Sequence, residues 1–446
     1  MRDGAVFQQL TGWKRRNTLP LSSLTNFRDT NMNRDRLLQR FLRYIQVDTA
    51  ANPKTKDYPS SQGQLELGAI LAQELLDCGL EDAVQDQHGL VMATIPSTLT
   101  STTGATTVIA WCSHVDTSPE QPSANVKPQI IESYQGGDIV LPGDPRQVIT
   151  VEENPELDEM RGETLITTDG TTLLGGDDKA GIAIIMETTA WLMEHPEIEH
   201  GPIRICFTCD EEIGRGTDRI DLETLGADAC YTLDGQGAGE VDVETFSADG
   251  ALVTIQGRNI HPSIGKGRMI NALRIAGRIL DRLPLETDSP ESTDERQGFL
   301  HPYVLQGGVA LATIEVLVRG FDEEELDRLS TLLCKVVAET EAEFPGAECR
   351  VEIQKQYRNM RDGLLQNPRV VENAEKAVCA IGLEPQRMII RGGTDGSRLT
   401  EMGLPTPNLS SGQHTPHSLK EWASLDQMEQ AAQVLVELAQ VWGKSD

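Results

Sequence analysis

The chain has 446 residues, with 39 basic and 69 acidic side chains, so its formal net charge is −30. Because a single hydrophobic core rarely grows to this size, we expect at least two domains. The acidic residues are spread along the chain and would repel phosphates and anionic lipids, which argues against nucleic acid or a membrane as partner.

The beginning of the chain shows neither a clear folding pattern nor a cleavable signal. Its basic run at 14–16 is followed by polar residues and Pro20 instead of an apolar segment, so we expect a cytoplasmic location. Apolar residues at helical spacing predict a helix over 34–47. We therefore expect residues 1–31 to be an N-terminal extension, to which we assign no role.

Helices and strands alternate through the first half of the chain. The pattern predicts helices over 64–80 and 179–194 and strands over 107–112 and 202–208. This alternation is typical of an α/β fold, a mixed, largely parallel sheet flanked by helices. In such sheets, ligands bind beyond the carboxyl ends of the strands.

The pattern changes near residue 246. Strands are predicted over 251–256, 308–318 and 349–353, and helices over 271–283 and 322–343. These elements fit a smaller α+β domain with a ferredoxin-like order. We therefore predict a catalytic domain split into 32–245 and 357–446, with an inserted domain at 246–356.

The eight cysteines of this long chain do not suggest a disulfide framework. Cys206 and Cys209 form a C-x-x-C pair that could indicate zinc or redox chemistry. They lie in and just past the predicted strand 202–208, where residues three apart point to opposite faces. We interpret both as structural residues.

Several possible metal ligands follow predicted strands or a glycine-rich turn. His114 and Asp116 lie two apart at a strand end, so the histidine could bind a metal while the aspartate fixes its tautomer. Asp177 follows two glycines, and its two oxygens could bridge two cations. Asp178 could serve instead, because the sequence does not show which side chain points inward.

An adjacent pair of glutamates follows the strand at 202–208. One of Glu211 and Glu212 can coordinate a metal while the other stays free as a general base for water. Asp234 follows another strand-like run and suits a terminal ligand. The last candidate is His417, with His414 as the alternative.

Together these fragments offer two histidines and three carboxylates, with one further glutamate beside them. A buried structural zinc site would use thiolates and close its coordination shell, whereas this set leaves room for water. The chain is therefore predicted to be a metal-dependent hydrolase.

Longer motifs carry a resemblance to a known family. They are Ser-His-Val-Asp-Thr-Ser-Pro (113–119), Leu-Ile-Thr-Thr-Asp-Gly (165–170), Leu-Leu-Gly-Gly-Asp-Asp-Lys-Ala-Gly-Ile-Ala (173–183) and Arg-Gly-Gly-Thr-Asp-Gly (391–396). From Met32 to near the C-terminus the chain resembles the peptidase T branch of the dinuclear-zinc metallopeptidases, which include carboxypeptidase G and acetylornithine deacetylase. The resemblance implies a tripeptide aminopeptidase with two Zn²⁺ per subunit, and a homodimer formed through the inserted domain.

The resemblance also implies a role for each matching residue. His114 and Asp234 would hold one zinc ion, Glu212 and His417 the other, and Asp177 would bridge them. The remaining roles are those of the base Glu211, the orienting residue Asp116, the lid residue His261 acting on the active site of the dimer mate, and the carboxylate-binding residues Arg319 and Arg391.

The chain departs from the family pattern near the last ligand: Lys420 stands where a second histidine is usual, and a tyrosine usual in the stretch around His414 is missing. Two alternatives also remain open. A deacylase or carboxypeptidase would use the same metals on N-acyl amino acids or dipeptides. A catalytically silent binding protein would lack the base or a ligand, yet every expected position is occupied.

Overall fold

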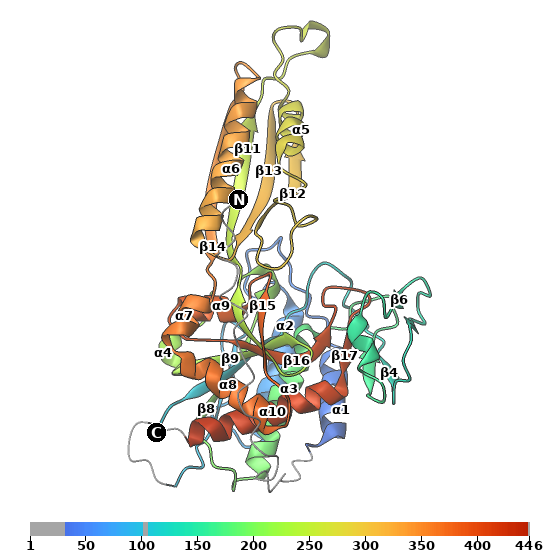
Figure 1. Ribbon diagram of the computed structural model, residues 1–446, viewed down its shortest axis with the longest axis vertical. Helices are drawn as coiled ribbons and strands as arrows, with labels where there is room; N and C mark the ends of the chain where they lie inside the picture. The colour runs from blue at the N-terminus through green and yellow to red at the C-terminus, as the bar shows by residue number, and fades with distance from the viewer. Residues whose placement is uncertain (1–31, 101–105, 445–446) are drawn as a thin grey trace, which may run out of the picture. The chain divides into compact units, whose positions relative to one another are not determined.

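The computed structural model of the chain describes residues 32–100 and 106–444, so the predicted N-terminal extension lies outside the described residues. An 11-stranded mixed sheet runs in the order β1-β2-β8-β3-β9-β16-β17-β7-β4, and β10 pairs with both β15 and β16 (Figure 1). Its strands are β1 (Val84–Gln85), β2 (Val91–Ile95), β3 (Ile109–His114), β4 (Gln129–Ile131), β7 (Leu165–Thr167), β8 (Ile203–Thr208), β9 (Ala229–Gln236), β10 (Glu240–Thr245), β15 (Gln386–Ile390), β16 (Asn408–His414) and β17 (Trp422–Ser424).

The centre of this sheet is parallel. β8, β3, β9 and β16 each run parallel to the next, whereas β2 and β17 pair antiparallel at either side. The predicted mixed, largely parallel sheet is thus confirmed. Because parallel strands end at the same edge, the residues that follow β3, β8 and β9 are brought together there.

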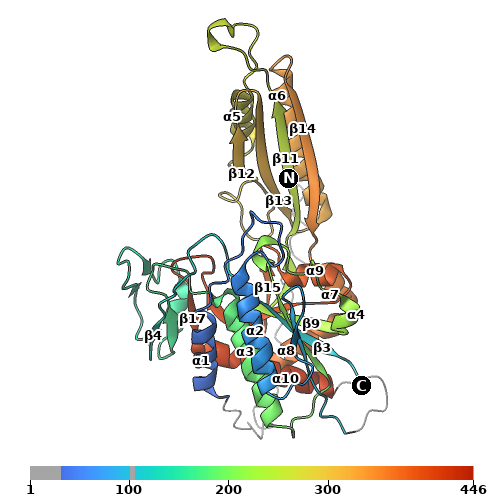
Figure 2. The same ribbon diagram turned by 180° about the vertical axis from the view of Figure 1, so that it is seen from behind.

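Helices cover both faces of the sheet, and Figure 2 shows α1, α2 and α3 on one of them. Alternate residues of β3 show the two faces, since Trp111 joins the core under α1, α3 and α10 while Cys112 joins the core under α4 and α9. None of the described helices is long and apolar enough to cross a membrane. The helices are α1 (Arg34–Tyr44), α2 (Gln62–Asp77), α3 (Gly176–Glu194), α4 (Leu222–Leu225), α7 (Arg361–Gln366), α8 (Pro368–Ala380), α9 (Asp395–Glu401) and α10 (Leu425–Gly443).

A second sheet has its own hydrophobic core. Its antiparallel strands lie in the order β12-β13-β11-β14, and α5 and α6 pack on one face. Along the chain the order is β-α-β-β-α-β, as in ferredoxin-like folds. The elements are β11 (Ser247–Gln256), α5 (Ala272–Arg282), β12 (Phe299–Gly307), β13 (Leu311–Gly320), α6 (Glu323–Ala342) and β14 (Glu348–Tyr357).

The sequence pattern missed β12. This strand lies at the edge of the second sheet, is mostly half-exposed or exposed, and contains Pro302. An edge strand tolerates proline and needs little apolar alternation, so the pattern gave no signal there. A separate pair, β5 (Ile139–Val140) and β6 (Val148–Ile149), completes the strands of the described region.

The C-x-x-C cysteines lie in different hydrophobic clusters, as their opposite orientations predict. Cys206 is buried with Cys112 and Cys230, whereas Cys209 belongs to the core on the other side of the sheet. Neither cysteine joins a possible metal-binding group within residues 32–100 and 106–444.

Candidate metal centre

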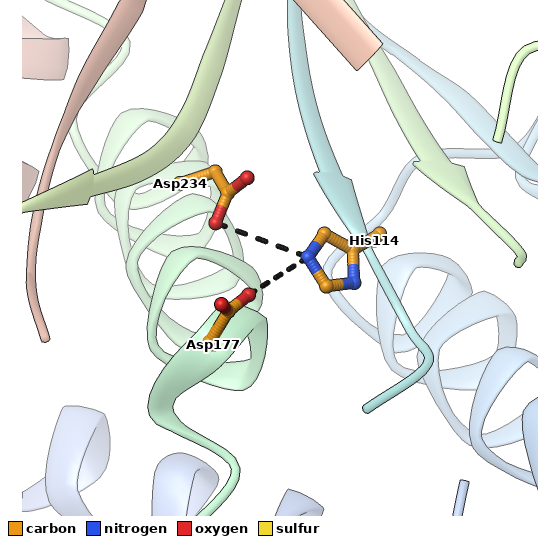
Figure 3. A group of neighbouring side chains, drawn as sticks. All are labelled: His114, Asp177 and Asp234. Atoms are coloured by element: carbon orange, nitrogen blue, oxygen red, sulfur yellow. Dashed lines mark hydrogen bonds and ion pairs between the residues drawn. The ribbon is translucent and has the colours of Figure 1, made fainter. Parts of the chain in front are cut away.

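Three side chains meet where β3 and β9 end beside the start of α3. His114 Nε2 lies 2.9 Å from Asp177 Oδ1 and 3.8 Å from Asp234 Oδ1. Figure 3 shows that the three side chains reach this point from three different elements. The imidazole and the two carboxylates form a group that could hold one metal ion.

A second group shares one of these carboxylates. His417 Nε2 lies 2.8 Å from Glu212 Oε2 and 3.3 Å from Asp177 Oδ2. In each group the candidate ligand atoms lie within 4.8 Å of one another. Asp177 therefore turns one oxygen toward His114 and the other toward His417, which is the arrangement of a carboxylate that bridges two ions.

The turn before α3 orients Asp177 toward the two histidines. Glu421 is buried, and its carboxylate accepts the backbone N–H groups of Leu174, Gly175 and Asp177 at 2.7, 2.8 and 3.0 Å. Gly175 adopts a φ of 81°, a left-handed conformation that favours glycine. As a result, three of the four backbone N–H groups from Leu174 to the bridging residue Asp177 are hydrogen-bonded to one carboxylate.

The neighbouring aspartate points elsewhere. Asp178 is fully buried, and its Oδ2 accepts hydrogen bonds from the Ser113 hydroxyl and, at 3.2 Å, from the His114 backbone N–H. Asp178 therefore stabilises the end of β3 through these hydrogen bonds, while Asp177 faces the candidate metal centre.

Asp116 contacts both the histidine and the glutamate pair. Its backbone oxygen lies 3.1 Å and its Oδ1 3.4 Å from His114 Nδ1. Its two carboxylate oxygens also accept the backbone N–H groups of Glu211 and Glu212 at 3.1 and 3.0 Å. Asp116 thus fixes the short helix η3 (Glu211–Ile213) as well as the imidazole.

Glu211 belongs to neither ligand group, although it lines the same cleft as Glu212 and Asp234. Burial raises the pKa of Glu211 well above the usual range. A half-buried carboxylate outside the ligand groups is suited to exchanging a proton with a bound water.

The alternative histidine has other partners. His414 Nε2 lies 2.7 Å from Gln427 Oε1, its Nδ1 lies 3.6 Å from Glu156, and its ring stacks on Trp422. His414 lines the cleft but joins neither group, whereas His417 does. Lys420, at the position that departs from the family pattern, pairs with Glu153 at 2.8 Å.

The pKa values of the centre are shifted because more carboxylates than histidines are gathered there. Burial and the nearby Asp177 raise the pKa of Glu212 to about 8 and that of Asp234 to about 6. Burial opposes protonation of His417, but its hydrogen bonds to Asp177 and Glu212 outweigh this and raise its pKa to about 11. Despite its own burial, Asp177 has a lowered pKa because both histidines hydrogen-bond to it.

These residues fit divalent cations. Imidazole nitrogens and carboxylate oxygens are ligands that zinc accepts, and cations would offset the clustered negative charge. Glu212 Oε1 is buried and has no hydrogen-bond partner within the described part of the chain, so it is free to coordinate.

The centre opens into a cleft of about 580 Å³. This volume falls within the roughly 300–1,000 Å³ of small-molecule sites. Its lining includes the apolar residues Met388, Ile389 and Ile390 together with polar and charged side chains.

The residues expected to bind substrate or to act as a lid lie farther from the metal groups. Arg391 lines the cleft, but its guanidinium donates to the backbone oxygens of Thr293, Glu295 and Gln297. Arg319 donates to two backbone oxygens, and His261 is exposed with its Nδ1 2.7 Å from Ser263 Oγ. Neither Arg319 nor His261 lines the cleft of its own chain.

Sequence reasoning missed two polar residues that hydrogen-bond to Asp234. Asn408 Oδ1 accepts the backbone N–H of Asp234 at 2.9 Å, and its Nδ2 donates to Asp242 Oδ2 at 2.8 Å. Gln413 Nε2 donates to Asp234 Oδ1 at 3.1 Å. The signal in the sequence was the presence of polar residues within the fully buried strand β16. Which residues they contact, however, depends on the pairing of β16 with β9 and β10.

Comparisons with known proteins identify the family of the chain. The sequence model of peptidase family M20/M25/M40 matches residues 167–441. Peptidase T of Geobacillus thermodenitrificans is 42% identical over 406 residues, which cover 91% of this chain and 98% of the relative.

Two solved structures share the fold over nearly the whole chain. Aminopeptidase PepT from Bacillus cereus has a TM-score of 0.70 and 24% identity, covering 93% of this chain and 100% of its own. A tripeptidase from Staphylococcus aureus has a TM-score of 0.71 and 25% identity, with the same coverage.

Proposed function

Because this chain belongs to peptidase family M20/M25/M40 and is a metallopeptidase, we propose that it is an aminopeptidase that removes the first residue of tripeptides with two zinc ions. The resemblance to the peptidase T branch, predicted from the motifs, is confirmed by the identity with curated relatives. The observation that carries the proposal is the carboxylate of Asp177, shared by two histidine-containing groups beside the unligated Glu211.

The proposed chemistry divides between the ions and the chain. Zinc held by His114, Asp177 and Asp234, and by Asp177, Glu212 and His417, would supply a water of lowered pKa and polarise the scissile carbonyl.

The chain itself would move the proton. Glu211 would take it from the water and return it to the leaving amine, which matches its burial beside the ligand groups. Asp116 would keep both the base and the imidazole of His114 in place through the hydrogen bonds described above.

Removal of the base tests this assignment. Glu211→Ala should keep both metal ions, measured by elemental analysis, while tripeptide turnover falls at least about 100-fold, the range of a lost general base. Glu212→Ala is the matched comparison, because it removes a ligand and should lower the metal content. Substantial turnover in Glu211→Ala would contradict the role of base.

The substrate class needs a separate assay. Tripeptides, dipeptides and N-acylated amino acids, offered side by side, separate an aminopeptidase from a deacylase or carboxypeptidase. Release of the free N-terminal residue from tripeptides is the expected result. Binding of all three without turnover would instead describe a silent protein on the same scaffold.

The proposal extends to the organisation of the chain. The second sheet, with its own core, supports an inserted lid and dimerisation domain at 246–356 that splits the catalytic domain into 32–245 and 357–446. His261 of the partner subunit would then act on the scissile carbonyl. A cytoplasmic location suits the eight free cysteines, because thiols persist in a reducing compartment.

A further inference from the structure

Two carboxylates of β10 stand beside the candidate metal centre without belonging to it. Glu240 and Asp242 both line the cleft, and Val241 between them is buried in the core. Strand alternation therefore presents both carboxylates on the same side. Asn408 bridges Asp242 to the backbone of the candidate ligand Asp234.

The metal ions would not account for these two charges. Asp177, Glu212, Asp234 and Glu211 offer four carboxylates, and two divalent cations would balance them, while Glu156, which also lines the cleft, lies 3.6 Å from His414 Nδ1. Any further carboxylate in the same cleft calls for a cation from elsewhere, because a buried charge is costly unless it is paired.

No basic side chain that lines the cleft supplies that cation. Arg391 donates to backbone oxygens of the loop at 293–297, and His414 contacts Gln427 and Glu156. His417 belongs to the second ligand group. The partner of Glu240 and Asp242 is therefore expected to arrive from outside the described chain.

A third acceptor belongs to the lining of the same cleft. Gln413 is 1% exposed and lines the cleft, and its amide N–H groups are directed to Asp234 at 3.0 and 3.1 Å. Its Oε1 has no hydrogen-bond partner among the described residues. A buried acceptor without a donor costs free energy that a ligand can recover.

The three acceptors match one functional group. A primary ammonium has three N–H donors and one positive charge, as the lysine side chain does. Asp242, Glu240 and Gln413 offer two negative charges and three acceptors to it. Asp242 already accepts a hydrogen bond from Asn408, but a neutral or anionic group would leave both carboxylates without a positive charge beside them.

The position of these acceptors also fits a cut at the first peptide bond. Only the Cα separates the α-amino nitrogen of a peptide from the carbonyl carbon of its first residue, a distance of roughly 2.5 Å. A subsite for that nitrogen must therefore adjoin the metal ligands. Gln413 and Asn408 both hydrogen-bond to Asp234.

We propose that Glu240, Asp242 and Gln413 form the subsite that binds the protonated α-amino group of the peptide substrate. The proposal rests on the aminopeptidase function and explains why cleavage requires a free N-terminus, since an N-acylated substrate has no ammonium to pair with these carboxylates. A site built to bind a donor rejects an analogue that lacks it.

Kinetics of charge-removing variants test the subsite. Asp242→Asn and Glu240→Gln should each raise KM for a free tripeptide at least about tenfold with little change in kcat, because they remove binding shared by the ground and transition states. Glu244→Gln is the matched control, since it lies on the same strand but pairs with Arg296 and does not line the cleft. Zinc content and thermal unfolding show whether each variant is folded and loaded.

A binding measurement keeps the subsite separate from the activity. In zinc-loaded Glu211→Ala, calorimetry should show that a tripeptide binds at least about 100-fold more tightly than its N-acetyl form. Adding Asp242→Asn to that protein should remove most of this preference, whereas adding Glu244→Gln should leave it.

The outcomes distinguish the two proposals. A wild-type enzyme that cleaves no tripeptide contradicts the proposed function, yet a preference for the free amine that depends on Asp242 still supports the subsite. Equal binding of the two peptides, or a preference unaffected by Asp242→Asn and Glu240→Gln, overturns the subsite even if tripeptides are cleaved.

Discussion

Glu421 shows how a single distant residue positions the candidate metal centre. It lies 244 residues from Asp177 in the chain, and its carboxylate accepts three backbone N–H groups of the turn that carries Asp177. Burial raises the pKa of Glu421 to about 7, while these hydrogen bonds act in the opposite direction. Rotation of the turn would leave buried donors and a buried acceptor unpaired, which is costly. Glu421 is therefore a positioning residue for the bridging carboxylate.

Replacing this carboxylate should weaken metal binding more than folding. In Glu421→Gln the new NH₂ group would face backbone donors, so we expect zinc affinity to fall about 10- to 100-fold, as for other residues that orient ligands. Titration calorimetry on chelator-treated protein measures the affinity. Glu163→Gln is the control, because Glu163 accepts from Ser424 and has no contact with the turn. Unchanged zinc affinity in folded Glu421→Gln would show that Glu421 does not position the bridging carboxylate.

At the scale of elements, the close approach of α3 to the sheet brings the ligands together. A Cβ added at Gly181 would come within 2.3 Å of the Leu233 backbone oxygen and 2.6 Å of Ser113 Oγ. The glycine thus lets the helix lie directly against β9 and β3, the strands that carry Asp234 and His114. Any larger residue must push α3, and Asp177 with it, away from both.

Gly181→Ala should therefore destabilise the protein by about 1–3 kcal/mol, the usual cost of overpacking. Gly277→Ala in α5 is the matched control, since no atom lies within 4 Å of the added Cβ. There the substitution should stabilise the protein by about 0.5–1 kcal/mol, because alanine loses less conformational entropy on folding than glycine does. Denaturant unfolding monitored by circular dichroism gives both values, and a neutral Gly181→Ala would contradict the close-packing account.

At the scale of the whole molecule, the proposed inserted domain at 246–356 would join two subunits into a dimer. His261 is exposed in that segment and does not line the cleft of its own chain. If the partner subunit's His261 completes each active site, then the base and the lid histidine of one site come from different chains.

Mixing two inactive variants tests this arrangement. Glu211→Ala and His261→Ala should each lose activity alone, but random subunit exchange would create mixed dimers with one intact site. About one quarter of the wild-type activity should then return. Activity measured after unfolding and refolding the mixture gives the answer, with each variant refolded alone as the control. No recovery despite exchange would show that His261 does not act on the active site of the partner subunit, and wild-type activity of His261→Ala alone would place His261 outside the active site.

How much could be predicted from the sequence depended on how local the information was. The helix periodicity of α1 and α3 and the apolar runs of β3 and β8 depend on neighbours in the chain, so their types and approximate ends were predicted. The residue types of His114, Asp177, Glu212, Asp234 and His417, several of them at strand ends or after a glycine-rich turn, likewise indicated metal chemistry before any contact was known.

The tertiary structure decided which way side chains face and what holds them. Asp178 turns away because Ser113 and the backbone of His114 bind it, and His414 turns away because of Gln427 and Trp422. The links from Glu421 to the turn, and from Asn408 and Gln413 to Asp234, join segments far apart in the chain. A sequence pattern reports the spacing of residues along one element, whereas these contacts depend on which strands pair and how closely the helices pack.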